Sequence, residues 1–120
     1  MRILIVEDDP VFAAYLREII STARPTAQIE RAGDGFDAGQ LTEKLRPQLV
    51  VLDINMPRMN GIELCRRLRA NGATQRARLV VLSSALTADN AAAAQAAGAD
   101  AWLEKGASRS EILKALQLMS

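Results

Sequence analysis

Residues 49–53 read Leu-Val-Val-Leu-Asp, and this stretch of four apolar residues followed by a carboxylate decides the fold. A strand with one face in solvent alternates apolar and polar residues, whereas a solid apolar run is typical of a strand covered on both faces. Residues 3–6 and 79–82 are likewise built from Ile, Leu and Val alone. The three runs therefore predict the buried strands of a parallel sheet.

Two weaker apolar stretches, 27–30 and 101–103, predict two further strands, and the first of them alternates as an edge strand does. Amphipathic segments with helical spacing separate the five strands. Their predicted inward faces are Phe12, Tyr15, Leu16 and Ile19; Ala38, Leu41 and Leu45; Leu64, Cys65 and Leu68; the alanines of 88–97; and Ile112, Leu113, Leu116 and Met119. This alternation predicts an α/β fold with helices on both faces of the sheet, joined by right-handed crossovers.

Polar residues mark where the predicted helices begin. Asp9 before Pro10 predicts an N-cap followed by proline at the first helical position. Thr87 predicts the cap of the fourth helix, and Ser108 or Ser110 opens the last one. We therefore interpret Asp9 as a helix cap rather than a metal ligand.

The composition indicates one globular domain over residues 1–120. Hydrophobic residues make up 49% and charged residues 24%, which excludes intrinsic disorder. The formal charge is +1, whereas domains that bind nucleic acid or membrane surfaces are usually far more basic, and the arginines of 66–69 are interpreted as a solvated helix face. From this charge we expect no direct contact to nucleic acid or membrane. Residues 1–10 do not resemble a secretion signal, so we expect a cytoplasmic protein.

The chain contains no histidine and one cysteine, Cys65, which removes several kinds of chemistry. Ser-His-Asp and Cys-His catalysis, histidine zinc sites and an intrachain disulfide are all excluded. Any reaction here must use carboxylates, hydroxyls, lysine and the backbone.

Polar side chains follow four of the predicted strands. Ligands of open α/β sheets bind beyond the carboxyl ends of the strands. The residues at these ends are Glu7, Asp8 and Asp9; Asp53; Ser83 and Ser84; and Glu104 and Lys105. If the first and third predicted strands are neighbours, three or four carboxylates converge, and either some of them are protonated or a cation is present. An all-oxygen site suits Mg²⁺ before Ca²⁺, and a lysine and a hydroxyl beside it describe a site for phosphoryl transfer.

Other phosphate-binding classes fit the sequence poorly. There is no phosphate-binding loop of the G-x-x-x-x-G-K-[ST] type, and the glycines of 33–39 have the wrong spacing for a dinucleotide-binding turn. An acidic first loop would repel the phosphate of a flavin, which disfavours a flavodoxin-like binder of small molecules. Asn55 stands where a D-x-D phosphatase would need an acid.

Residues 53–61, Asp-Ile-Asn-Met-Pro-Arg-Met-Asn-Gly, resemble the D-x-x-M-P-x-M-x-G segment of the response regulator receiver domain. Glu7 and Asp8 resemble the acidic end of that family's first strand. Ser83, thirty residues after Asp53, and Lys105, twenty-two residues later, also match the family's spacing. The resemblance covers essentially the whole chain and implies a doubly wound (βα)5 fold, flavodoxin-like, with strand order 2-1-3-4-5.

The resemblance implies a phosphorylation site with its metal ion. Asp53 would be the phosphoacceptor and a Mg²⁺ ligand. Asp8 would bind Mg²⁺ directly, Glu7 would act through a bound water, and Asn55 would offer its backbone carbonyl.

It also implies the groups that hold the phosphoryl oxygens, Ser83 and Lys105. Ser83 would act as a switch residue together with Trp102, which occupies the place of the family's switch aromatic and could equally be simple edge-strand packing. The chain departs from the family at Gly106, where proline commonly follows the lysine.

The function implied is a regulatory phosphoacceptor of a two-component phosphorelay, not an enzyme. A sensor histidine kinase or a histidine phosphotransfer protein would supply the phosphohistidine. Phosphorylation would change the surface of the fourth helix, last strand and last helix. This surface would control a homodimer or, if residues 1–120 are the N-terminal part of a longer regulator, a C-terminal effector domain. The alternative is a degenerate receiver that binds a partner without being phosphorylated.

Overall fold

The fold of the computed structural model, described for residues 1–56 and 59–119, is organised around β3 (Leu49–Asp53). This strand lies between β1 (Arg2–Val6) and β6 (Arg78–Ser83) in a five-stranded sheet. The outer strands are β2 (Gln28–Ala32) and β7 (Ala101–Glu104). All neighbours pair in parallel, in the order β2-β1-β3-β6-β7. The strands β4 (Asn55–Met56) and β5 (Met59–Asn60) form a separate antiparallel pair. The strands β6 and β7 are therefore the fourth and fifth strands of the main sheet, which confirms the predicted order 2-1-3-4-5.

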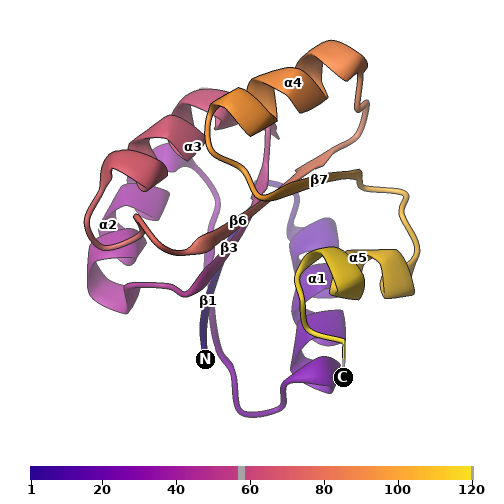
Figure 1. Cartoon of the computed structure of the whole chain (residues 1–120). Helices are drawn as coiled ribbons and strands as arrows, with labels where there is room; N and C mark the ends of the chain where they lie inside the picture. Colours follow the sequence, from indigo (N-terminus) through magenta and orange to yellow (C-terminus); the bar gives the residue numbers. More distant parts are fainter. Residues whose placement is uncertain (57–58, 120) are drawn as a thin grey trace.

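Helices cover both faces of the sheet (Figure 1). One face carries α1 (Pro10–Ala23) and α5 (Arg109–Ala115). The other face carries α2 (Gly35–Leu45), α3 (Gly61–Ala70) and α4 (Ala88–Ala96). No helix in the described part of the chain is long and apolar enough to cross a membrane.

The solid apolar runs of the central strands follow from this double covering. In β1, Ile3 and Ile5 belong to the core under α1 and α5, whereas Leu4 and Val6 belong to the core under α2, α3 and α4. Successive side chains of a strand point to opposite faces, so a strand between two cores needs apolar residues at every position.

Side-chain caps start the helices where the sequence predicts them. The Asp9 carboxylate accepts from the Val11 N–H at 3.0 Å, and Pro10 is the first residue of α1, which confirms the predicted cap. Thr87 caps α4 in the same way. Ser108, rather than Ser110, caps α5 and forms a capping box with Glu111.

The last helix is shorter than the apolar spacing predicts. It ends at Ala115, and Gln117 then adopts a left-handed conformation with φ 59°. This reverses the chain, so that the Leu118 N–H donates to the Leu113 carbonyl at 2.9 Å and Leu118 is buried. The prediction that Met119 continues the inward face is wrong, because Met119 lies beyond this turn and is 52% exposed.

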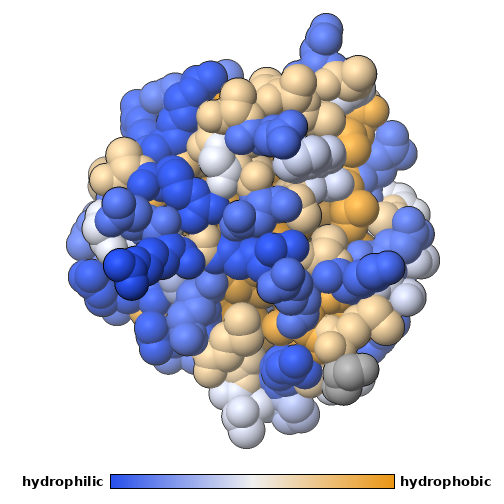
Figure 2. Space-filling model, viewed as in Figure 1, coloured by the Kyte–Doolittle hydropathy of each residue, from blue (hydrophilic) through white to orange (hydrophobic). Residues whose placement is uncertain are grey.

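The fourth helix is weakly anchored to the sheet. Between its ends, α4 buries Ala94 alone, whereas α1 buries four residues. Burying a methyl group removes little apolar surface from water, so the docking of α4 stabilises the fold less than that of α1. Figure 2 shows pale apolar residues gathered over α4, as expected of a helix that exposes alanines.

The single cysteine lies in the core under α2, α3 and α4. Cys65 is fully buried, and this burial raises the pKa of its thiol to about 11. A buried thiol of this kind behaves as a small apolar residue.

Arg69 ties the C-terminal end of α4 to the rest of the molecule. Its guanidinium group donates to the carbonyls of Gly98, Gln75 and Ala77 and to the carboxylate of Asp100, at 2.6–3.1 Å. These bonds use all five N–H donors of the side chain. Gly98 has φ 102°, and a Cβ there would meet the Arg69 side chain at 3.0 Å, so the clamp needs glycine at this turn.

The predicted solvated face is therefore correct for only two of its three arginines. Arg66 and Arg67 are exposed and pair with Glu63 on the same helix. The Arg69 side chain is only 28% exposed, because it bonds to the loops that follow α3 and α4. A helical spacing of charges does not reveal that one of them has carbonyl partners in two other loops.

We expect Arg69→Lys to lower the free energy of unfolding by about 2–3 kcal/mol, because one ammonium cannot replace a five-donor fork and leaves carbonyls unsatisfied. Urea unfolding measures this loss. Arg66→Lys is the matched control and should change stability by less than about 0.5 kcal/mol. Equal stability of the two variants would contradict the clamp.

Candidate functional site

The carboxyl ends of the parallel strands meet at one edge of the sheet and carry the site. The register of β1 and β3 brings Glu7 level with Asp53. The register of β6 and β7 brings Ser83 beside Glu104, one residue before Lys105. Side chains that are distant in sequence therefore converge because of the strand order alone.

Three carboxylates come together at this edge. Glu7, Asp8 and Asp53 each offer an oxygen atom, and these oxygens lie within 4.8 Å of one another. Glu7 is buried and Asp53 is 4% exposed, whereas Asp8 faces solvent. The donor set is all oxygen and carries a high negative charge, which fits a Mg²⁺ ion. Asp8 and Asp53, with Glu7 behind them, are the residues that could hold it.

Lys105 connects the two buried carboxylates. Its ammonium lies 2.5 Å from Glu7 Oε1 and 3.1 Å from Asp53 Oδ2. Burial lowers the pKa of Lys105, but its hydrogen bonds to Glu7 and Asp53 and the negative charges of these two groups together outweigh this and hold that pKa above its ordinary value. The lysine is therefore positively charged at neutral pH and compensates part of the buried negative charge.

The other oxygen of Asp53 is held by the loop that follows it. The Asn55 N–H donates to Asp53 Oδ1 at 2.9 Å, while the Asn55 side chain donates to the Ser83 hydroxyl at 2.9 Å. The Ala85 N–H also donates to this hydroxyl, at 3.2 Å. Ser83 is buried and fixed in position, whereas Ser84 is exposed. The metal-binding role of the Asn55 carbonyl stays a prediction.

The three acidic residues after β1, Glu7, Asp8 and Asp9, make different contacts. Asp9 caps α1, and its N–H donates to Glu7 Oε2 at 3.2 Å, so both oxygens of Glu7 are engaged. The carboxylate of Asp8 is the exposed member of the acidic cluster. The geometry agrees with the separation of Asp8 and Asp9 into ligand candidate and cap.

Arg31 supports this loop and was missed by sequence reasoning. From β2, its Nε donates to the Glu7 carbonyl and its Nη2 to the Asp8 carbonyl, both at 2.9 Å. The sequence signal for this contact is that Arg31, a long cationic side chain, lies at the end of the predicted edge strand, next to the strand that ends in the acidic loop.

Gly61 lets α3 approach the back of the phosphoacceptor candidate. A Cβ at this position would lie 2.6 Å from the Asp53 carbonyl oxygen and closer still to Ile54 Cα. The glycine at the end of the 53–61 segment is therefore needed for packing against the loop after Asp53. Met56 is buried in the core under α2, α3 and α4. Pro57 and Arg58 lie outside the described residues.

Trp102 lies on the edge strand β7, where it is partly exposed and packs against the core under α2, α3 and α4. This agrees with its interpretation as edge-strand packing. Its switch role stays a prediction.

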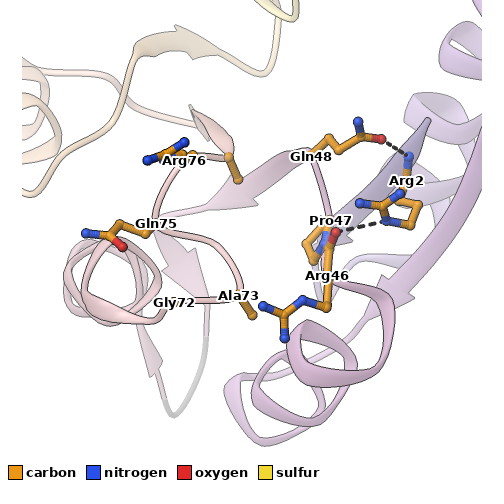
Figure 3. Close-up of a pocket in the computed structure, with 9 residues that line it drawn as sticks. Arg2, Arg46, Pro47, Gln48, Gly72, Ala73, Gln75 and Arg76 are labelled. Carbon is orange, nitrogen blue, oxygen red and sulfur yellow. Dashed lines mark hydrogen bonds between the residues drawn. The ribbon is translucent and has the colours of Figure 1, made fainter.

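A cavity of about 250 Å³ lies away from this site, at the edge of the sheet where the strands begin (Figure 3). Arg2, Arg46 and Gln48 are among its lining residues. The Arg2 guanidinium donates to the Arg46 carbonyl at 3.0 Å. This cavity contains none of the predicted site residues.

The sheet order and the acidic site with its lysine are those expected of a receiver domain, and comparisons with known proteins give the same family. Residues 3–117 match the model of the response regulator receiver domain, and the chain belongs to this family. It is thus a regulatory domain of two-component signalling.

Individual relatives give the same result. The nitrate/nitrite response regulator protein NarL of Escherichia coli K12 is 34% identical over 114 residues, which cover 95% of this chain and 52% of that protein. The chain therefore spans about half the length of this relative.

Solved structures extend the comparison. The signal receiver domain of a DNA-binding response regulator from Colwellia psychrerythraea 34H has a TM-score of 0.92 and 33% identity, covering 98% of this chain and 95% of that one. A response regulator from Burkholderia pseudomallei, solved with a phosphorylated aspartic acid, a calcium ion and citrate, has a TM-score of 0.85 and 27% identity, covering 97% of this chain and 66% of that one.

We expect Asp8→Ala and Asp9→Ala to have separate effects. Asp8→Ala removes a carboxylate from the cluster and should weaken Mg²⁺ binding at least tenfold, measured by titration calorimetry. Asp9→Ala should leave Mg²⁺ affinity near the wild-type value and lower the free energy of unfolding by about 1 kcal/mol, because it removes the cap of α1. A larger loss of Mg²⁺ affinity in Asp9→Ala would reverse the two assignments.

Proposed function

We propose that this chain is a phosphoacceptor switch that takes a phosphoryl group onto Asp53 from the phosphohistidine of a partner. The observation that carries the proposal is the environment of Asp53. Its carboxylate is buried, faces Lys105 with one oxygen and the Asn55 N–H with the other, and lies beside Glu7 and Asp8.

The reaction is a transfer between two groups. A carboxylate oxygen of Asp53 forms a bond to phosphorus while the bond from phosphorus to the partner's imidazole nitrogen breaks, and the electron pair of that bond stays on the imidazole. These 120 residues contain no histidine, so the donor histidine lies outside this sequence, and we propose a sensor histidine kinase or a histidine phosphotransfer protein as its source. A water oxygen then bonds to phosphorus while the bond from phosphorus to the Asp53 oxygen breaks, which releases inorganic phosphate and restores the aspartate carboxylate.

The residues around Asp53 stabilise the transferred charge. The Lys105 ammonium lies 3.1 Å from Asp53 Oδ2, and the Ser83 hydroxyl accepts from the Asn55 side chain, so both would lie near the oxygens of a phosphoryl group on Asp53. Mg²⁺ held by Asp8 and Asp53 would neutralise further charge on the phosphoryl group. The relative from Burkholderia pseudomallei, with its phosphorylated aspartic acid and calcium ion, supports this chemistry.

We expect a small phosphodonor such as acetyl phosphate to phosphorylate Asp53 in the presence of Mg²⁺, and beryllofluoride with Mg²⁺ to bind in its place. Mass spectrometry should detect one added phosphoryl group on the wild type and none on Asp53→Asn. Asp9→Asn is the matched control, since asparagine also caps helices, and should still be phosphorylated. Absence of the acyl phosphate on the wild type would favour a degenerate receiver that only binds partners.

The proposed output is a shift of the surface formed by α4, β7 and α5. Ser83 immediately precedes the loop to α4, and Lys105 immediately follows β7. A phosphoryl group bound by both would pull on the two segments that flank the weakly anchored helix, while Arg69 holds its C-terminal end at Gly98. This surface would control a C-terminal effector domain or a homodimer, in the cytoplasm.

We expect beryllofluoride with Mg²⁺ to change hydrogen exchange within residues 83–105, most strongly in the N-terminal half of α4, because low-stability elements open first. The Asp53→Asn variant, given the same additions, should be unchanged. Protection changes confined to α1 or α2 would contradict the proposed surface.

A further inference from the structure

Phe12 faces the ammonium of Lys105. The nitrogen atom lies 4.8 Å from the centroid of the phenyl ring, within the range of a cation–π interaction. Phe12 is the third residue of α1, and Lys105 follows β7 at the other end of the sequence. The assigned roles of Lys105 do not involve this ring.

The ammonium is enclosed on three sides. Glu7 and Asp53 each accept from it, which leaves one of its three N–H groups without a carboxylate partner among the residues that the structure describes. The negative face of the phenyl ring supplies a third favourable surface. The Lys105 side chain is accordingly only 19% exposed.

The ring is held in place by the loop that also supplies the acids. Asp9 and Pro10 fix the first turn of α1, so Phe12 follows Glu7 after a short segment that the helix cap holds in place. The ring packs against the core under α1 and α5 and stays partly exposed. A leucine could fill the same place in the core, but it would not attract a cation.

We propose that Phe12 is a positioning residue for Lys105, whose ring face keeps the ammonium beside Asp53 when the phosphoryl group arrives. This rests on the proposed phosphorylation of Asp53. Lys105 must then exchange a carboxylate oxygen for a phosphoryl oxygen, and a contact that does not change during the exchange limits the movement of the ammonium. Phe12 acts through Lys105 and does not itself touch the reacting atoms.

The contact is tested first without metal or phosphodonor. Phe12→Leu, Lys105→Met and the double variant form a cycle in which urea unfolding is measured. Phe12→Leu should raise the equilibrium constant for unfolding about two- to fivefold more in the wild type than in the Lys105→Met background. Equal effects in both backgrounds would mean that Phe12 only packs, and would overturn the proposal.

The functional consequence is tested with beryllofluoride and Mg²⁺. Phe12→Leu should weaken beryllofluoride binding about three- to tenfold, Phe12→Tyr should retain it because the ring face is kept, and Mg²⁺ affinity measured alone should be unchanged in both. Phe36→Leu is the matched control, since Phe36 is an exposed aromatic residue in the first turn of α2.

Beryllofluoride binding distinguishes a failure of the phosphoacceptor function from a failure of the proposed role of Phe12. A wild-type protein that binds no beryllofluoride would contradict the phosphoacceptor function and the role of Phe12 with it. Beryllofluoride binding that is equal in the wild type and Phe12→Leu would overturn the role of Phe12 and leave the phosphoacceptor function standing.

Discussion

The burial of two carboxylates side by side, Glu7 and Asp53, is the constraint on which the rest of the site depends. Away from water, each charge lacks solvation and repels the other, so a cation must compensate them. Lys105, which follows the last strand of the sheet, provides this positive charge. Because its ammonium arrives from β7, the site forms only after β1, β3, β6 and β7 have assembled in their observed order.

Local patterns were enough to predict the five strands and the edge of the sheet that carries the candidate site. The solid apolar run before Asp53 reflects a strand between two cores, and the polar residues after each run mark one edge of the sheet. The Asp9 cap was likewise visible, because its bond reaches only two residues along the chain. The strand order came from the family resemblance, since no local pattern specifies which parallel strands are neighbours.

What could not be predicted depends on contacts between distant residues. Arg69 bonds to Gly98, twenty-nine residues away, and Arg31 bonds to Glu7, twenty-four residues away. The sequence around Arg69 resembles that of any exposed arginine, and the signal for Arg31 is limited to its place on an edge strand beside the acidic loop. The end of α5 was also missed, because Gln117 adopts a left-handed conformation that usually marks itself by a glycine.

The buried thiol of Cys65 has a practical consequence for labelling. Thiol reagents attack the thiolate, and this thiol is both inaccessible and, with a pKa of about 11, almost wholly protonated near neutral pH. A cysteine introduced on the exposed side of α4, for example by Ala92→Cys, would therefore react with a maleimide dye while the native one does not. Fluorescent or spin labels can thus be attached to the natural sequence background without first removing Cys65.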